Sequence, residues 1–256
     1  MATEQPQFIL IDGSYFVFYR YFAILNWFKF AKKDQIIDKD NLPENNTEFV
    51  EKFKKTFQTK LLEIPKKLKI KNPIILVGCD CPREEIWRMK HLNTYKANRV
   101  YDDTFLGGPF FKMAYNDNLF QEGGAKEVFR FPQLEADDCL AILTKDIIKK
   151  YPQANITIIT SDMDYLQLAQ TNVHLYDLKF KKLTERKTEM DVATIRDDQN
   201  GLSSVMGIRK KRQERQRDLV ETVRRQRQAE LGKKRGPRLP KTRRAIHAFL
   251  GWSLGF

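Results

Sequence analysis

The chain has 256 residues and a formal net charge of +13, which is distributed unevenly. Residues 1–200 carry 30 Lys and Arg against 29 Asp and Glu, whereas residues 201–256 carry 16 against 4. A hydrophobic content of 41% excludes a disordered body. Neither a membrane-spanning run nor a signal peptide is recognisable, and three cysteines are too few for a disulfide framework. We therefore expect a folded, nearly neutral body with a basic tail, in an intracellular, non-secreted protein of the cytoplasm or nucleus that has no membrane partner.

Short apolar runs recur along the body, and helical patterns separate them. Runs rich in β-branched residues and without polar alternation are typical of strands buried on both faces. Strands that alternate with helices predict an α/β fold, in which a mainly parallel central sheet is covered on both sides in three α/β/α layers. The expected strands are 8–11, 74–78, 127–130, 156–160 and 173–176.

The helical patterns differ in clarity. Phe49, Phe53, Phe57 and Leu61 recur every four residues and form one apolar stripe. Residues 134–150 predict a second helix, and residues 164–170 begin a short third helix. The glycine-containing stretch 101–124 predicts a mobile segment or an irregular pair of helices. Residues 208–231 are charged nearly all round, which indicates a helix that is exposed or that forms on binding.

Carboxylates follow four of the expected strands. The carboxyl ends of parallel strands meet at one edge of a sheet, so these residues are expected to converge there. Glu135 and Asp138 are three apart on the expected helix and share a face, so Asp137 should point elsewhere unless the first turn is distorted. The carboxylate residues are Asp12, Asp80, Glu135, Asp137, Asp138, Asp162 and Asp164.

So many carboxylates cannot remain ionised close together without cations. Oxygen ligands suit Mg²⁺ or Mn²⁺. Two such ions about 4 Å apart would activate a water and stabilise the leaving oxygen during phosphodiester hydrolysis. The structural alternative is that each acidic residue only forms a turn, caps a helix or complements a helix dipole.

Four segments together resemble the 5′-3′ exonuclease and flap endonuclease family. They are 9–14, 80–99, 134–138 and 160–168, and the second contains Tyr95-Lys96-Ala97-Asn98-Arg99. The aromatic run 14–20 is similar to versions from large DNA viruses. The resemblance covers about residues 8–180. It implies a PIN-like 5′-3′ nuclease domain, here residues 1–195, that acts as a monomer on DNA with 5′ ends, flaps or junctions and uses two Mg²⁺ ions.

The resemblance also assigns roles to residues. It places Lys96 and Arg99 at the scissile phosphate and Arg88 just upstream, and a solvated helix face is the structural alternative. Tyr15 and Tyr19 could stack an unpaired base, although a core-facing helix also explains them. Residues 101–124 fall where the family has a helical arch or clamp. The implied first metal site comprises Asp12, Asp80, Glu135, Asp137 and Asp138, and the second includes Asp162 and Asp164.

The resemblance ends before the basic tail, residues 196–256. The family continues with a Gly-Asp-x-x-Asp-Asn-Ile-like motif that completes the second metal site, and residues 197–200 substitute poorly for it. Three interpretations of the tail are a foreign segment from a truncation, fusion or frame shift, an Arg-rich clamp on nucleic-acid backbones, and a disordered extension. Two alternative functions follow for the whole chain: a weak or inactive nucleic-acid-binding protein with a degenerate nuclease fold, and a PIN-like ribonuclease, which the Tyr-Lys-x-x-Arg block disfavours.

Overall fold

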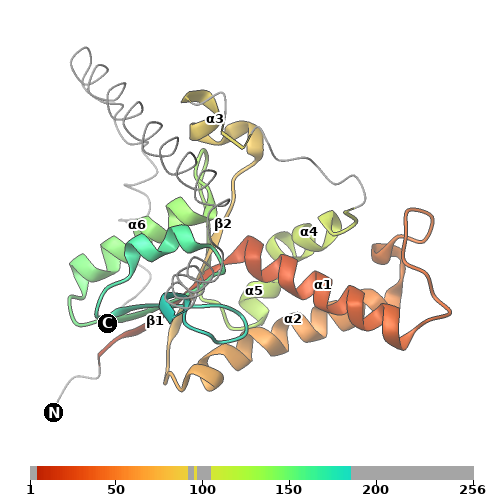
Figure 1. Ribbon diagram of the computed structural model, residues 1–256, viewed down its shortest axis with the longest axis horizontal. Helices are drawn as coiled ribbons and strands as arrows, with labels where there is room; N and C mark the ends of the chain where they lie inside the picture. Colours follow the sequence, from red (N-terminus) through yellow and green to blue (C-terminus); the bar gives the residue numbers. More distant parts are fainter. Residues whose placement is uncertain (1–4, 92–94, 97–104, 186–256) are drawn as a thin grey trace, which may run out of the picture. The chain divides into compact units, whose positions relative to one another are not determined.

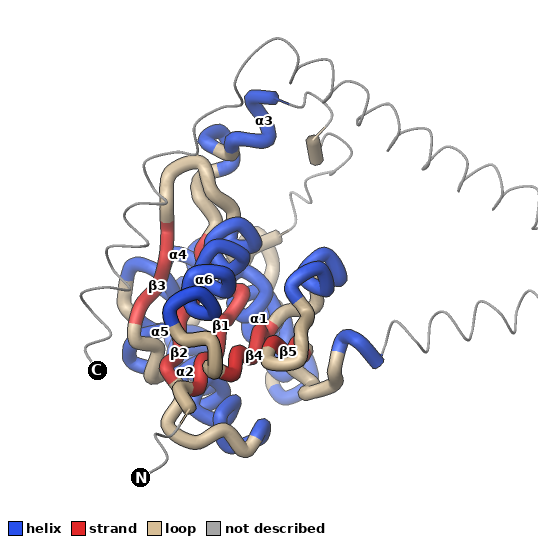
Figure 2. The backbone as a smooth tube through the Cα atoms, turned by 90° about the vertical axis from the view of Figure 1, so that its left-hand side faces the viewer, coloured by secondary structure: helices blue, strands red, loops and turns tan. Residues whose placement is uncertain are grey.

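Five parallel strands form one central sheet in the order β3–β2–β1–β4–β5, which is the order in which Figure 2 shows them. The structure is a computed structural model that describes residues 5–91, 95, 96 and 105–185. The predicted α/β fold with a parallel sheet is confirmed, and every predicted strand lies within one residue of the observed one. The strands are β1 (Gln7–Asp12), β2 (Ile74–Cys79), β3 (Glu127–Arg130), β4 (Asn155–Ile159) and β5 (Val173–Tyr176).

Helices cover both faces of the sheet, which gives the three predicted layers (Figure 1). One face is covered by α1 (Gly13–Ala31), α2 (Thr47–Leu68), α4 (Gly108–Asn116) and α5 (Leu119–Glu122). The other face is covered by α6 (Ala136–Lys150) and the 3₁₀ helix η3 (Met163–Leu168). The remaining short elements are η1 (Pro43–Asn45), η2 (Arg83–Glu85) and α3 (Trp87–His91).

Alternation along β1 builds a separate core on each face. Ile9 and Ile11 pack with the helices of the α1 face, whereas Phe8 and Leu10 pack with those of the α6 face. The predicted stripe of α2 lies in the first core, where the rings of Phe16 and Phe57 meet edge to face at 4.9 Å. The sheet is therefore buried on both faces. Open parallel sheets place their functional sites outside the carboxyl ends of the strands.

The structure changes one predicted helical segment and decides between the alternatives for another. The helix expected over 164–170 is the 3₁₀ helix η3, which Asp162 caps by accepting a hydrogen bond from the Asp164 amide. Residues 108–122 form α4 and α5, whose buried residues, such as Phe110 and Phe120, pack into the core. For these residues the structure agrees with the irregular pair of helices, one of the two interpretations of 101–124. That this segment covers a single strand stays a prediction.

Several predictions fall outside the described residues. These are Arg99, the domain boundary at 195/196 and the whole basic tail. Among the helices of the described part, none combines the length and apolar character that crossing a membrane requires. Cys79, Cys81 and Cys139 are free and buried.

Candidate active site

Asp12 ends β1 and caps α1, and both of its carboxylate oxygens accept hydrogen bonds. The Tyr15 amide donates to Oδ1 at 3.1 Å, and the Thr160 hydroxyl donates to Oδ2 at 3.2 Å. The same hydroxyl accepts from the Asp162 amide at 3.2 Å, so Thr160 joins the ends of β1 and β4. Burial raises the pKa of Asp12 to about 6, and the negative charges of Asp80 and Asp137 add to this effect.

Asp80 follows β2 and connects three elements at the same edge. Its Oδ1 accepts from the Ala136 amide at the start of α6 at 2.8 Å, and its Oδ2 accepts from the Ser14 hydroxyl of α1 at 2.5 Å. Gly13 permits this approach of α1 to β2, because a Cβ atom at that position would lie 2.6 Å from the Gly78 carbonyl oxygen. The donors to Asp80 are therefore neutral groups that fix its position without cancelling its charge.

Three carboxylates gather at the start of α6. Oxygens of Glu135, Asp137 and Asp138 lie within 4.8 Å of one another. The expectation that Asp137 points away from the other two is wrong. Glu135 is the N-cap residue of α6 and has extended backbone angles (φ −86°, ψ 167°), so it lies outside the helical repeat on which that expectation depended.

Basic residues from the segment after β2 bind two of these three carboxylates. The Arg88 guanidinium donates to both oxygens of Asp138 at 2.6 and 2.7 Å and to Glu135 Oε2 at 2.8 Å. Its distance to Asp137 Oδ1 is longer, at 3.7 Å. The Lys96 ammonium forms an ion pair with Glu135 Oε1, and the Tyr95 hydroxyl donates to Glu135 Oε2 at 2.6 Å. Arg88 and Lys96, both predicted to be catalytic, thus lie directly at the acidic residues.

The nearest charged partners separate the carboxylates into two kinds, and the pKa values of Glu135 and Asp137 illustrate the difference. Burial tends to raise the pKa of Glu135, but hydrogen bonds from Lys96 and Tyr95 lower it below its ordinary value. The pKa of Asp137 is instead raised to about 6, by burial and by the adjacent Asp138 carboxylate. We call Glu135 and Asp138, to which Arg88 donates hydrogen bonds, the paired group. We call Asp12, Asp80 and Asp137 the uncompensated group, because no described cation lies closer to their carboxylate oxygens than the 3.7 Å between Arg88 and Asp137. Together with Asp162 they form the acidic edge.

The last two predicted metal ligands follow β4 and are exposed. Asp162 belongs to the edge, because its amide donates to the Thr160 hydroxyl, which in turn donates to Asp12. The Asp164 amide donates to Asp162 Oδ1 at 2.9 Å. Among the described residues, the compact set of three carboxylates includes neither Asp162 nor Asp164.

Tyr15 and Tyr19 both lie on α1 and are partly buried against the core. The Tyr15 hydroxyl accepts a hydrogen bond from the Leu178 amide at 3.1 Å. The Arg20 guanidinium lies over the Tyr19 ring, 4.6 Å from the ring centroid. These contacts give both rings a structural role, and their stacking on nucleic acid stays a prediction.

Sequence reasoning missed the groups that support the acidic edge. Ser14, Thr160 and Trp87, whose indole donates to Asp138 at 3.3 Å, were not assigned a role. Ser14 and Thr160 stand within two residues of Asp12 and Asp162, and hydroxyls so close to clustered carboxylates were the available signal. The Trp87 contact depends on how η2 and α3 fold back on α6, which no local pattern reveals.

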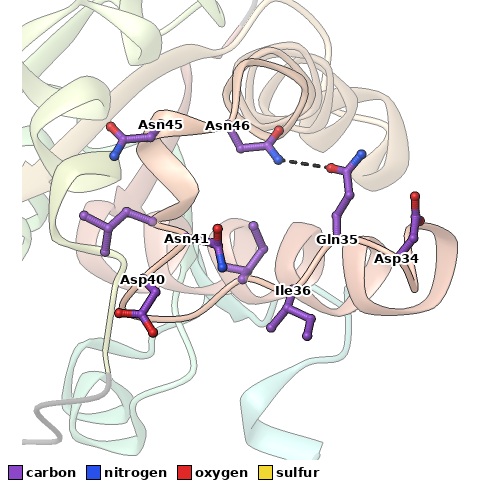
Figure 3. A pocket seen from close by; sticks show the side chains of 9 residues that line it. Asp34, Gln35, Ile36, Asp40, Asn41, Asn45 and Asn46 are labelled. Atoms are coloured by element: carbon purple, nitrogen blue, oxygen red, sulfur yellow. Dashed lines mark hydrogen bonds between the residues drawn. The ribbon is translucent and has the colours of Figure 1, made fainter.

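A hollow of about 540 Å³ lies far from this edge, after the carboxyl end of α1 (Figure 3). Polar side chains such as Asp34, Asn41 and Asn45 line it, and Asn46 donates to Gln35 at 3.1 Å across it. Because α1 has 19 residues, its two ends are about 28 Å apart. The hollow therefore belongs to a different part of the molecule from the carboxylates.

The donor set at the acidic edge fits a hard divalent cation. It consists of carboxylate oxygens, which are the ligands that Mg²⁺ and Mn²⁺ prefer. Burial, with a further contribution from neighbouring carboxylates, raises the pKa of Asp12 and Asp137 to about 6, and a bound cation would offset both effects. The uncompensated group is therefore where a cation would be held most favourably.

A family model described as 5′-3′ exonuclease, N-terminal resolvase-like domain, matches residues 7–199. No curated protein matches the chain. Solved structures similar to the chain include a T5 protein crystallised with metal ions (18% identity, TM-score 0.44), the T5 5′-exonuclease with bound zinc (18%, 0.42) and the bacteriophage T5 flap endonuclease with DNA and metal ions (14%, 0.37). Each match covers 69% of this chain, which spans 57% of the length of each of these proteins.

Proposed function

Because the chain belongs to the 5′-3′ exonuclease family, we propose that it hydrolyses phosphodiester bonds in DNA that has a free 5′ end, a flap or a junction. The reaction depends on divalent cations, Mg²⁺ or Mn²⁺, held at the acidic edge, and two ions take part. The acting unit is the domain assigned to residues 1–195, as a monomer.

The observation that carries the proposal is that carboxylates from the ends of β1, β2 and β4 and from the start of α6 lie at one edge of the sheet. Any one acidic residue after a strand is explained by a cap or a turn, and Asp12 does cap α1. Capping alone does not account for a pKa of about 6 at both Asp12 and Asp137. Folding buries these carboxylates near one another, which disfavours their charged forms. Such perturbed pKa values are characteristic of functional sites.

The residues of the uncompensated group would hold the first cation, with Glu135 and Asp138 beside it, and Asp162 and Asp164 would contribute to the second. When bound, such cations supply Lewis-acid activation of a water and neutralise charge at the phosphate. The protein contributes positioning: Thr160 and the Tyr15 amide orient Asp12, and Ser14 and the Ala136 amide orient Asp80.

Arg88 and Lys96 would act on the phosphate side of the same edge. Both cations already touch Glu135, and Arg88 also binds Asp138, so a phosphate entering the edge would meet them directly. Fixed positive charge at that position offsets the charge that develops on the phosphate oxygens in the transition state. Arg99 belongs to the same predicted set.

The proposal is tested by cleavage of labelled DNA. Purified protein is incubated with a 5′-flap DNA, a blunt duplex and a single-stranded RNA, each with Mg²⁺ or with chelator. Asp137→Asn keeps the shape of the side chain and removes its charge. The matched control is Asp34→Asn, an exposed aspartate at the far hollow.

We expect Mg²⁺-dependent cleavage of the flap DNA. Removal of a supporting group around a metal typically costs about 10–100-fold in activity or affinity, and Asp137→Asn should exceed this because it removes a direct ligand. Asp34→Asn should keep the wild-type rate. DNA binding without metal-dependent cleavage would contradict the proposal and favour a binding protein with a degenerate nuclease fold, and preferential cleavage of RNA would favour a ribonuclease.

A further inference from the structure

Arg130 is the last residue of β3, the strand that lies next to β2 at one side of the sheet. It pairs with Cys79, the last residue of β2, and therefore stands beside Asp80. Its guanidinium Nε donates to the Asp80 carbonyl oxygen at 3.4 Å, and the residue is exposed. Neither the predicted motifs nor the proposed function assigns Arg130 a role.

The aromatic ring of Tyr115 on α4 lies against this side chain. The Arg130 Cζ atom is 5.7 Å from the ring centroid, which is within the range of cation–π contacts. The Tyr115 hydroxyl oxygen lies 3.3 Å from that of Ser14, which donates to the Asp80 carboxylate. Arg130 therefore contacts the surroundings of Asp80 in two ways, through the backbone carbonyl and through the Tyr115 ring.

The position and partners of Arg130 differ from those of the two cations at the paired group. Arg88 and Lys96 form ion pairs with Glu135, next to the start of α6. Arg130 forms no ion pair with a carboxylate in the part of the chain that the structure describes. Its neighbour Tyr115 packs on the α1 face of the sheet, whereas α6 covers the other face. The basic residues thus flank the acidic edge on two sides.

The chemistry of an exposed guanidinium beside this edge matches a backbone phosphate. A guanidinium has several N–H donors in a rigid planar fork, which suits bidentate binding of phosphate. A DNA strand that presents one phosphate to Arg88 and Lys96 carries further phosphates, about 3.4 Å apart along the axis of a duplex. A positive group on the opposite side of the edge can bind one of these.

We propose that Arg130 binds a backbone phosphate of the DNA on the α4 side of the acidic edge, opposite Arg88 and Lys96. The inference rests on the proposed function, because it requires DNA at this edge. Arg130 is then a substrate-binding residue, which fixes how the strand lies across the carboxylates and does not take part in the chemical step.

The test measures how binding of a labelled 5′-flap DNA to the full chain depends on the concentration of KCl, in chelator, which prevents metal-dependent hydrolysis. Arg130→Gln and Arg130→Met remove the positive charge, and Arg130→Lys keeps it. Lys126→Gln is the matched control, because it removes one charge from an exposed residue about 13 Å away, next to the other end of β3.

Each phosphate contact adds about 0.7–0.9 to the steepness with which log K falls with log salt concentration. Arg130→Gln should therefore bind the DNA more weakly and reduce this slope by about 0.7–0.9. Arg130→Met, which retains an apolar side chain beside Tyr115, should show the same reduction. Arg130→Lys and Lys126→Gln should keep the wild-type slope. All four variants should melt near the wild-type temperature, because both residues are exposed.

Different failures overturn different claims. If the wild type neither binds the flap DNA nor cleaves it in Mg²⁺, the proposed function is wrong, and the role of Arg130 is overturned with it. If the wild type cleaves the DNA but both neutral Arg130 variants leave the slope unchanged, the role of Arg130 alone is wrong. A reduction no larger than that of Lys126→Gln would also overturn it, because Arg130 would then contribute only to the net charge.

Discussion

The two groups of carboxylates lie at the same edge of the sheet, yet they are stabilised in opposite ways. The paired group, Glu135 and Asp138, is bound by Arg88, and Glu135 also by Lys96. In the uncompensated group, Asp12 and Asp80 accept hydrogen bonds from hydroxyls and backbone amides. The pKa is lowered at Glu135 and raised at Asp12.

The difference indicates that the two groups serve different purposes at the site. Neutral donors fix a carboxylate in place and leave its charge available to a cation. Guanidinium and ammonium groups cancel the charge and at the same time hold positive groups at the position where a phosphate would arrive. The chain therefore brings cation ligands and phosphate-facing cations to one edge, without letting the basic residues fill the whole acidic site.

The free energy of unfolding should fall most when the paired group loses the Arg88 guanidinium. Arg88→Met leaves the half-buried Asp138 without its bidentate partner, and breaking a buried ion pair typically costs about 3–5 kcal/mol. We expect a loss in the free energy of unfolding near the lower end of this range, because the Arg88 side chain is 22% exposed. Urea denaturation in chelator measures it.

The control for Arg88→Met is Lys32→Met. It breaks the ion pair between Lys32 and Glu48, whose side chains are 34% and 46% exposed. Exposed pairs contribute about 0–1 kcal/mol. Equal losses for the two variants would show that the paired group is not held by its ion pairs.

A smaller effect should come from the neutral donors of the uncompensated group. Ser14→Ala removes the hydroxyl that donates to Asp80. A hydrogen bond to a charged group contributes about 1.5–3 kcal/mol, and we expect a loss of about 1.5 kcal/mol in the free energy of unfolding. Thr59→Ala removes a hydroxyl that donates to the Lys55 carbonyl oxygen on the exposed face of α2, and it should cost less. A Ser14→Ala protein as stable as Thr59→Ala would contradict the supporting role of Ser14.

The smallest expected effect is a pH dependence of stability. The pKa of Asp12 rises from an ordinary value of 3.8 to about 6 on folding, so its contribution to stability is present below pH 4 and is lost as the pH rises through 6. In chelator, Asp12→Asn should melt near the wild-type temperature at pH 4.5 and about 2–4 °C above it at pH 7.5. A difference in melting temperature that does not change with pH would show that Asp12 is not desolvated.

The sequence predicted the elements that carry this edge more completely than the contacts within it. The apolar runs ending at Asp12, Asp80 and Asp162 identified three strands and their common edge, because a parallel sheet leaves little freedom in where its strand ends lie. The same reasoning failed for Asp137, since helix periodicity does not apply to an N-cap residue such as Glu135.

Tertiary packing decided what local patterns could not. The stretch 101–124 has glycines typical of a loose segment, yet its described part is anchored by buried residues such as Phe110 and Phe120. The hydrogen-bond partners of Glu135 are Arg88, Tyr95 and Lys96, which lie about 40–50 residues earlier in the chain. Such long-range hydrogen bonds depend on the exact path of the backbone, which composition and periodicity do not specify.

Binding of Mn²⁺, followed by electron paramagnetic resonance without DNA, tests most directly the claim that the uncompensated group holds a divalent cation. The wild-type protein and Asp34→Asn should bind Mn²⁺ with the same affinity, and Asp137→Asn should bind it more than about 10-fold more weakly. Equal affinity in all three proteins would contradict the claim that this edge is a metal centre.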